Sequence, residues 1–282
     1  MKKLIVFLAI TVLLIVPSVS LLAQTQGQEN FIRVTGANSM SSRVKDLVDL
    51  FKKADPSVTI EVVTGGFVDS GILAVINGEA DLAMASCTIP EKEDNLAVTK
   101  GLKLFVRPMG FGGIAIIANS SEGVQNLTLD EIKNIFTGQI TNWKQVGGSD
   151  KPIKVIRTGD NHPGTLFFLQ NDFMHAPFTS QATVVSTFPE LVASVAGTIG
   201  SIGYVRIREI TESPIVKNNP GVQVISVGRA KATLPVYPSR EAVADRTYPL
   251  LRPYYIVYSE KAKKVVVGFA DFLVSQGWGP SW

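Results

Sequence analysis

The chain has 282 residues, of which 45% are hydrophobic and 18% are charged, and this composition excludes an intrinsically disordered protein. Its formal net charge of +3 is too small to indicate a nucleic-acid or anionic-membrane partner. The single cysteine, Cys87, excludes an intrachain disulfide, and with His162 and His175 as the only histidines we expect no metal site and no cofactor.

Residues 1–23 have the features of a cleaved signal peptide. Lys2 and Lys3 form a basic start, an apolar run follows over Leu4–Val16, and small residues around Ser18 and Ala23 suit a signal peptidase. The run is shorter than the roughly 20 residues that span a bilayer, although a membrane-anchoring helix is the alternative. No cysteine follows the run, so a lipoprotein anchor is not expected. We therefore expect an exported, periplasmic protein.

The next part of the chain alternates between strand and helix patterns. Apolar residues recur at helical spacing from Met40 to Phe51, and Asp55-Pro56 is expected to end that helix. A second, short helix is predicted from Asp69 and Ser70 to Gly78. The expected strands around these helices are Phe31–Thr35, Val58–Val63 and Asp81–Ser86. This order predicts an α/β unit with a parallel sheet.

A similar alternation continues to the end of the chain. Gly113–Ala118 is continuously apolar, as in a strand covered on both faces, and Thr128–Glu131 forms a capping box before a helix that Gly138 ends. Further strands are expected at Pro152–Arg157, Ser201–Val205, Val222–Ser226 and Tyr254–Tyr258, and further helices at Gly164–Phe173 and Ala262–Leu273. The fold class is therefore α/β throughout.

Three turns that lead from a strand into a helix are rich in Gly, Ser, Asn or Thr. They are Gly36–Met40, Gly65–Gly71 and Asn161–Thr165, and Arg157 precedes the third. A helix start presents unpaired backbone N–H groups and a positive dipole end, so it favours an anion. Such turns meet at the carboxyl edge of an open α/β sheet. Ordinary helix capping is the alternative for each single turn.

The chain resembles the phosphate-binding proteins of bacterial ABC transporters, which have the type II periplasmic binding protein fold. The resemblance covers roughly residues 30–280, and its best segments are Gly78–Ser86, Leu127–Trp143, Gly200–Val205 and Tyr248–Pro253. It implies two lobes joined by a hinge. Lobe one is expected to contain residues 28–112 and 239–282, and lobe two residues 113–238.

The resemblance also implies ligand-binding residues at the three turns and the arginine. They are Ser39 and Met40 in the first turn, Ser70 and Gly71 in the second, Arg157, and Gly164 and Thr165 in the third. Together these groups would surround a tetrahedral oxyanion with hydroxyl, backbone N–H and guanidinium donors.

The third turn and the position after Ser86 depart from the family pattern. The third turn is longer than usual, and Pro163 replaces the family serine and so lacks both a hydroxyl and an N–H. His162 is a compensating donor or a solvent-exposed loop residue. Cys87 stands where the family often has Asp or Arg, and a thiol is a weak donor and acceptor. We therefore expect Cys87 and His162 to modulate the ligand.

These observations favour a periplasmic solute-binding receptor for an inorganic oxyanion, with phosphate first, that delivers it to the permease subunits of an ABC transporter. Sulfate, molybdate or tungstate are alternative ligands, and a sensory or adhesive relative without a ligand is a further alternative. A hydrolase using Cys87 or a serine with His162 is disfavoured because the chain lacks a Gly-x-Ser-x-Gly motif. We expect no catalytic residues, no nucleic-acid partner and a monomer.

Overall fold

The computed structural model describes residues 29–159 and 163–277, so the signal peptide predicted at residues 1–23 lies outside them. The strands are β1 (Phe31–Gly36), β2 (Thr59–Val62), β3 (Leu82–Ala85), β4 (Leu104–Asn119), β5 (Asn126–Thr128), β6 (Lys154–Thr158), β7 (Thr183–Val185), β8 (Ser201–Arg206), β9 (Val222–Gly228) and β10 (Leu251–Ser259). The helices are α2 (Ser41–Ala54), α3 (Val68–Asn77), α4 (Glu91–Thr99), α5 (Leu129–Phe136), α6 (Pro163–Phe167), α7 (Phe188–Gly197), α8 (Arg208–Thr211), α9 (Pro214–Lys217), α10 (Arg240–Ala244) and α11 (Lys264–Gln276). A π-helical segment, Phe168–Met174, follows α6 directly.

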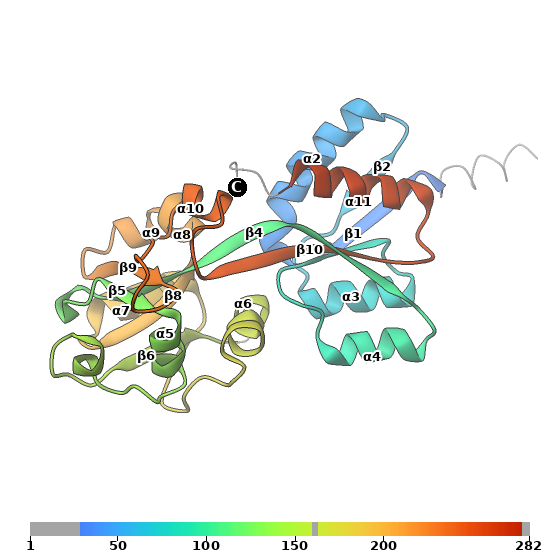
Figure 1. Ribbon diagram of the computed structural model, residues 1–282. Helices are drawn as coiled ribbons and strands as arrows, with labels where there is room; N and C mark the ends of the chain where they lie inside the picture. Colours follow the sequence, from blue (N-terminus) through green and yellow to red (C-terminus); the bar gives the residue numbers. More distant parts are fainter. Residues whose placement is uncertain (1–28, 160–162, 278–282) are drawn as a thin grey trace, which may run out of the picture.

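One long strand organises the molecule. β4 has 16 residues, and at about 3.3 Å per residue it is roughly 50 Å long. Its first part pairs with β10, up to the partners Gly113 and Leu251, and its second part pairs with β8 and β9. Figure 1 shows β4 and β10 running side by side between two groups of helices, so the two strands join two halves of the protein.

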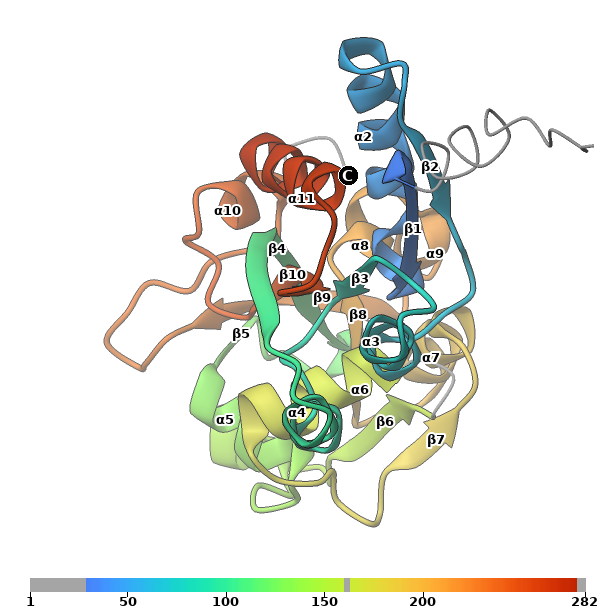
Figure 2. The same ribbon diagram turned by 90° about the vertical axis from the view of Figure 1, so that its right-hand side faces the viewer.

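The first half is built on β1, β2 and β3, which are parallel to one another, with β10 antiparallel to β3. Helices α2, α3, α4 and α11 surround these strands (Figures 1 and 2). The rings of Phe269 and Phe272 on α11 contact Phe51 of α2 at centroid distances of 5.0 and 5.1 Å. The C-terminal helix therefore packs on the N-terminal part of the chain.

The second half contains the buried end of β4. Ile114, Ile116 and Ile117 have no exposed surface, in agreement with the apolar run that predicted a strand covered on both faces. β6 is parallel to β8 and β7, and β5 is parallel to β9. Thr128 and Glu131 form the predicted capping box at the start of α5, because each side chain accepts a hydrogen bond from the other residue's backbone N–H.

The chain returns from the second half to the first along β10. Before this strand, Tyr248 is buried and donates a hydrogen bond from its hydroxyl to the carbonyl of Ile114, and α10 lies beside α8 and α9 (Figure 1). Residues of the 239–250 segment therefore contact β4 in the second half before the chain enters β10. The lobe boundaries at residues 112/113 and 238/239 stay a prediction.

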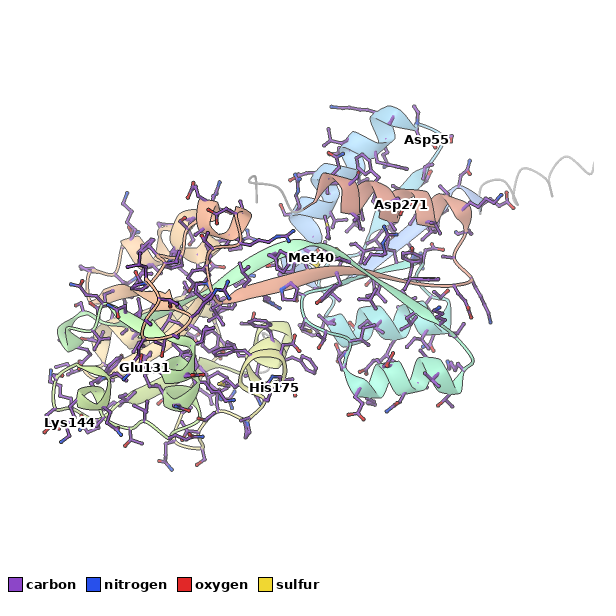
Figure 3. All side chains as sticks on the ribbon, in the orientation of Figure 1. Met40, Asp55, Glu131, Lys144, His175 and Asp271 are labelled. Atoms are coloured by element: carbon purple, nitrogen blue, oxygen red, sulfur yellow. The ribbon has the colours of Figure 1, made fainter. Side chains whose placement is uncertain are left out.

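Charged side chains lie mostly on the outside of both halves. Asp55 and Asp271 lie on the first half, and Glu131 and Lys144 lie on the second (Figure 3). Within the described residues, no helix is both long enough and apolar enough to cross a membrane.

Two glycines in helices of the first half should respond oppositely to alanine. A Cβ at Gly71 in α3 would lie 2.5 Å from the Cα of Gly36, whereas a Cβ at Gly268 in α11 would meet nothing within 4 Å. We expect Gly71→Ala to destabilise the fold by about 1–3 kcal/mol through overpacking. Gly268→Ala should stabilise it by about 0.4–1 kcal/mol because the unfolded chain loses freedom. Urea unfolding measures both, and equal effects would contradict the packing described for α3.

Candidate functional site

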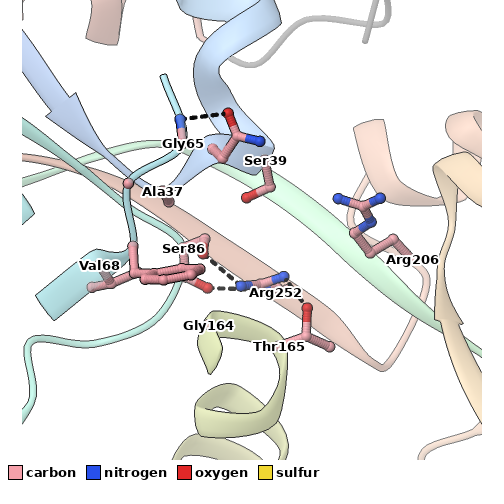
Figure 4. A pocket seen from close by; sticks show the side chains of 12 residues that line it. Ala37, Ser39, Gly65, Val68, Ser86, Gly164, Thr165, Arg206 and Arg252 are labelled. Atoms are coloured by element: carbon pink, nitrogen blue, oxygen red, sulfur yellow. Dashed lines mark hydrogen bonds between the residues drawn. The ribbon is translucent and has the colours of Figure 1, made fainter. Parts of the chain in front are cut away.

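A cavity of about 250 Å³ lies where the two halves meet. Its lining comes from the β1–α2 turn, the start of α3, the end of β3, the start of α6, and β8 and β10 (Figure 4). The lining residues are Ala37, Asn38, Ser39, Gly65, Gly66, Phe67, Val68, Ser86, Gly164, Thr165, Arg206 and Arg252. The first two turns that the sequence singles out therefore line the cavity. Of the third turn, the described residues Gly164 and Thr165 line it too.

The first two turns are held together by Asn38. Its side-chain oxygen accepts hydrogen bonds from the backbone N–H of Gly65, at 3.3 Å, and from the hydroxyl of Ser41, at 3.4 Å. Its own backbone N–H donates to the carbonyl of Gly66 at 3.2 Å. These bonds fix the turn that carries Ser39 beside the start of α3, and the side chain of Ser39 faces the cavity (Figure 4).

Arg252 lies in the cavity wall at the boundary between the two halves. It lies at the start of β10, is 2% exposed, and donates from Nε to the carbonyl of Ser86 and from Nη2 to the Ser86 hydroxyl. Its Nη1 donates to the hydroxyl of Thr165 at 2.8 Å. Ser86 belongs to the first half and Thr165 to the second, so one guanidinium bonds both sides of the cavity (Figure 4).

The glycine at position 164 permits this approach. A Cβ there would lie 2.9 Å from Nη2 of Arg252 and 2.9 Å from the hydroxyl oxygen of Ser86. A Cβ atom at that distance would force one of these neighbours to move. Ser86 and Arg252 have little room to move, because both are buried and they are bonded to each other. The absence of a side chain at Gly164 therefore lets the start of α6 reach the guanidinium.

The charge of Arg252 has no carboxylate partner among the described residues. Its three hydrogen-bond partners are neutral, and none of the ion pairs found in residues 29–159 and 163–277 includes it. Burial lowers the pKa of Arg252, Arg206 lowers it further, and Tyr254, Cys87 and Asp172 oppose the shift. Arginine nevertheless stays protonated in proteins. The cavity wall therefore holds a buried positive charge for which the described residues provide no carboxylate counter-ion.

Arg206 supplies a second positive group from the end of β8. It pairs with Glu209, and its guanidinium carbon lies 4.9 Å from the ring centroid of Phe188. Its Nε is buried and has no hydrogen-bond partner within the part of the chain that the structure describes. Figure 4 shows Arg206 on the far side of the cavity from Val68.

The structure brings together part of the residue set expected from the sequence. Ser39, Gly164 and Thr165 line the cavity, whereas Met40, Ser70, Gly71 and Arg157 do not. Met40 is fully buried, and Gly71 packs against Gly36. His162 lies outside the described residues. For every residue of the set expected from the sequence, whether or not it lines the cavity, ligand binding stays a prediction.

Ser70 and Arg157 are engaged elsewhere. The Ser70 hydroxyl oxygen accepts from the backbone N–H of Phe67 at 3.0 Å and donates to the carbonyl of Phe67 at 3.1 Å, so Ser70 caps its own helix. Arg157 is partly buried at the end of β6, and its Nη1 donates to the carbonyl of Thr158 at 3.0 Å.

Cys87 lies behind the cavity wall. It is 1% exposed, does not line the cavity, and is preceded by Ser86, which does. Burial raises the pKa of the Cys87 thiol to about 12, although the charge of Arg252 opposes this shift. The structure therefore does not place the Cys87 thiol in direct contact with the cavity, and its predicted effect on the ligand stays a prediction.

Sequence reasoning missed three of the lining residues, Arg252, Arg206 and Ser86. A signal for Arg252 was present, because Tyr248–Pro253 is one of the segments that carry the family resemblance. Arg206 follows a predicted strand and looks like an ordinary solvent-facing arginine in the sequence. Only the pairing of β4 with both β8 and β10 brings these two arginines to one cavity.

A second polar contact joins the halves at the edge of the site. Asp172 on the π-helical segment accepts from the backbone N–H of Thr88 at 3.1 Å and from its hydroxyl at 2.6 Å. Thr88 follows Cys87, so this contact, like the bonds of Arg252 to Ser86, involves the chain that leaves β3. The arrangement can hold a small anion between two groups of donors that belong to different halves.

Comparisons with known proteins identify the family of the chain. A family model described as a PBP superfamily domain matches residues 20–276. The chain is 24% identical over 245 residues to the phosphate-binding protein PstS of Bacillus subtilis, covering 87% of this chain and 75% of the relative. It is 25% identical over 277 residues to PstS of Borreliella burgdorferi, covering 94% and 93%.

Solved structures show the same similarity. An ABC-type phosphate transport receptor from Vibrio cholerae superposes with a TM-score of 0.68 at 26% identity, covering 86% of this chain and 93% of that chain. A substrate-binding protein from Clostridium perfringens, solved with bound phosphate, superposes with a TM-score of 0.60 at 28% identity and covers 86% and 93%.

The reactivity of Cys87 tests the buried environment behind the site. An ordinary thiol has a pKa of about 8.5, so a thiol with a pKa of about 12 has far less thiolate near neutral pH. We expect the folded protein to react with a thiol reagent at about pH 8 roughly a thousandfold more slowly than the urea-unfolded chain. The rate should also keep rising with pH where that of the unfolded chain levels off. Rapid labelling of the folded protein would contradict this placement of Cys87.

Proposed function

Because the chain belongs to the PBP superfamily, we propose that it is an extracytoplasmic receptor that binds phosphate in the cavity around Arg252 and presents it to an ABC transporter. The names of its relatives support this proposal, since they are phosphate-binding proteins and a phosphate transport receptor. The proposed binding residues are Arg252, Ser39, Ser86, Gly164 and Thr165.

The observation that carries the proposal is the buried charge of Arg252, to which no carboxylate of the described residues is bonded. Burying a cation is costly unless an opposite charge or strong hydrogen bonds offset the loss of water. Arg252 has three neutral partners, and none of the residues found to line the cavity is Asp or Glu. An anion in the cavity would supply the missing opposite charge at bonding distance.

The bonds of Arg252 also support a binding mode in which the ligand contacts both halves of the protein. Ser86 and Thr165 come from opposite halves and bond the same guanidinium. A ligand that contacts Arg252 and these hydroxyls would therefore touch both halves at once. Ligand binding would stabilise the arrangement in which the halves are close, and a transporter could recognise that arrangement.

The cysteine environment supports a receptor rather than a hydrolase. A cysteine nucleophile acts as a thiolate and is usually partly exposed in an electropositive setting with a lowered pKa. Cys87 is 1% exposed, does not line the cavity, and has its pKa raised to about 12. A measurement of phosphate binding by isothermal titration calorimetry distinguishes a receptor from a sensory relative that has no ligand.

Replacing Arg252 by methionine tests the proposed site. We expect Arg252→Met to lower phosphate affinity more than a hundredfold, because removing one member of a buried ion pair costs about 3–5 kcal/mol. The ligand-free variant should be no less stable to heat than the wild type, since methionine fills similar volume without a buried charge. Isothermal titration calorimetry and thermal unfolding give the two readouts.

Arg157→Met is the matched control, because Arg157 precedes the same turn but does not line the cavity. We expect it to weaken phosphate binding less than Arg252→Met. Phosphate at a hundred times its dissociation constant should stabilise the wild type by about 2.7 kcal/mol. Wild-type affinity in Arg252→Met, or a larger loss in Arg157→Met, would refute the assignment of the anion to Arg252.

A further inference from the structure

We propose that Asp172 and Thr88 form a latch outside the cavity, and that this latch determines how long bound phosphate is retained. The carboxylate of Asp172 accepts hydrogen bonds from the backbone N–H and from the hydroxyl of Thr88, and the two residues belong to different halves. Neither is among the residues that line the cavity in the described part of the chain. The inference rests on the proposed function and adds a pair of residues that acts on phosphate release without touching phosphate.

In the first half, the latch is close to the cavity wall along the chain. Ser86 accepts hydrogen bonds from Arg252, Cys87 is 1% exposed, and Thr88 is exposed. Two residues of extended chain span at most about 7 Å, so Thr88 lies within that distance of the cavity residue Ser86. The buried Cys87 between them leaves little room for one to move without the other.

In the second half, one continuous helical element carries both a cavity residue and the latch. Thr165 lies in α6, and Asp172 lies in the π-helical segment Phe168–Met174 that follows α6 directly. The chain after this segment is bonded to α5, because the backbone N–H of Thr179 donates to the carbonyl of Phe136 at 2.8 Å. Figure 1 shows α6 on the side of the second half that faces α3 and α4. The element therefore belongs to the second half and presents two contacts to the first.

The backbone of this element departs from ordinary helix geometry where it carries Asp172. π-helices are rare and occur frequently at functional sites. The buried side chains of the segment are Phe168, Leu169 and Met174, which anchor it, whereas Asp172 is partly exposed. The segment ends at His175, whose φ of 53° lies in the left-handed region that few residues other than glycine adopt. The π-helical geometry places a partly exposed carboxylate at the boundary between the halves.

The same two chain segments are thus linked at two points. Inside the cavity, Arg252 bonds Ser86 and Thr165. Outside the cavity, Thr88 bonds Asp172. A phosphate that contacts Ser86 and Thr165 leaves when these two residues move apart, and that movement also breaks the bonds of the latch. The latch therefore raises the barrier to release, whereas the cavity residues determine which anion binds.

The charge of Asp172 also acts on the site, and this decides which latch residue to replace. Asp172 opposes the fall in the pKa of Arg252 and adds to the rise in the pKa of the Cys87 thiol. Replacing Asp172 alone would remove a negative charge near the guanidinium and so favour an anion, in addition to breaking the latch. Replacing the Thr88 hydroxyl changes a hydrogen bond without changing any charge, so Thr88 gives the cleaner test.

Thr88→Val tests the latch, because it removes the hydroxyl that bonds Asp172 at 2.6 Å and keeps the branched shape. We expect phosphate to leave this variant roughly three- to tenfold faster, as for the loss of one charge-assisted hydrogen bond at a partly exposed position. The association rate constant should change less than about twofold. Rapid filtration of the full chain with radiolabelled phosphate, chased with unlabelled phosphate, measures release, and direct mixing measures association.

Matched variants separate the latch from general effects on the fold. Thr88→Ser keeps the hydroxyl and should release phosphate at nearly the wild-type rate. Thr247 makes the same two bonds to Asp245, at 2.9 Å from its backbone N–H and at 2.6 Å from its hydroxyl, but within one turn rather than between the halves. Thr247→Val should therefore leave release unchanged. Fast release from Thr88→Ser or from Thr247→Val would contradict the inference.

A double-mutant cycle shows whether Thr88 acts through Asp172. In an Asp172→Ala background the Thr88 hydroxyl has lost its partner, so adding Thr88→Val should change the release rate by less than about twofold. The charge effect of Asp172→Ala is common to both proteins and cancels. If Thr88→Val accelerates release equally in both backgrounds, its effect does not depend on Asp172 and the inference is wrong.

The outcomes separate the latch from the proposed function. Thermal unfolding checks that Thr88→Val folds, and Thr88→Ala is a second variant without the hydroxyl. If the wild type binds phosphate and both variants release it at the wild-type rate, the latch is overturned and the proposed function stands. If the wild type binds no phosphate, the proposed function is refuted and this inference fails with it.

Discussion

A buried guanidinium with no carboxylate partner in residues 29–159 and 163–277 is the constraint on which the boundary between the two halves depends. Arg252 lies between the two halves, and its hydrogen bonds run to the carbonyl and hydroxyl of Ser86 on one side and to the hydroxyl of Thr165 on the other. Neutral hydrogen bonds offset only part of the free energy of burying a charge. In the proposed function an anion in the cavity offsets the remainder, and Gly164, Ser86 and Thr165 lie around the guanidinium that this anion would contact.

The long paired strands explain how a single side chain can serve both halves. Arg252 pairs with Gly112 at the point where β4 leaves β10 and begins to pair with β8 and β9. A residue at this point belongs to the strand that connects the halves, so it is close to loops from each. A residue on a peripheral loop would contact one half alone, whereas a residue on the connecting strand lies between the two. The contact of Asp172 with Thr88 adds a second link at the edge of the same boundary.

Local patterns in the sequence predicted most of the elements, because capping boxes, apolar periodicity and strand-ending turns act over a few residues. The Thr128–Glu131 box and the buried strand within β4 are examples. The same patterns could not separate Ser70 from Ser39: both are serines near a helix start, yet Ser70 caps its helix and Ser39 faces the cavity. Arg252 and Arg206 could not be placed, since their meeting depends on strand pairings between distant segments. Tertiary pairing, rather than propensity, decides which polar residues share a site.

The structure changes the interpretation of Cys87, the residue that stands where the resembled family often has Asp or Arg. The thiol does not border the cavity, so it does not itself replace a ligand acceptor. The thiol nevertheless interacts electrostatically with Arg252. The guanidinium opposes the rise in the pKa of the Cys87 thiol, and Cys87 opposes the fall in the pKa of Arg252. A carboxylate at this position would compensate the guanidinium from within the protein and reduce its need for an anion. A neutral, buried thiol adds no negative charge beside Arg252, so in the proposed function the guanidinium charge remains available to an anion in the cavity.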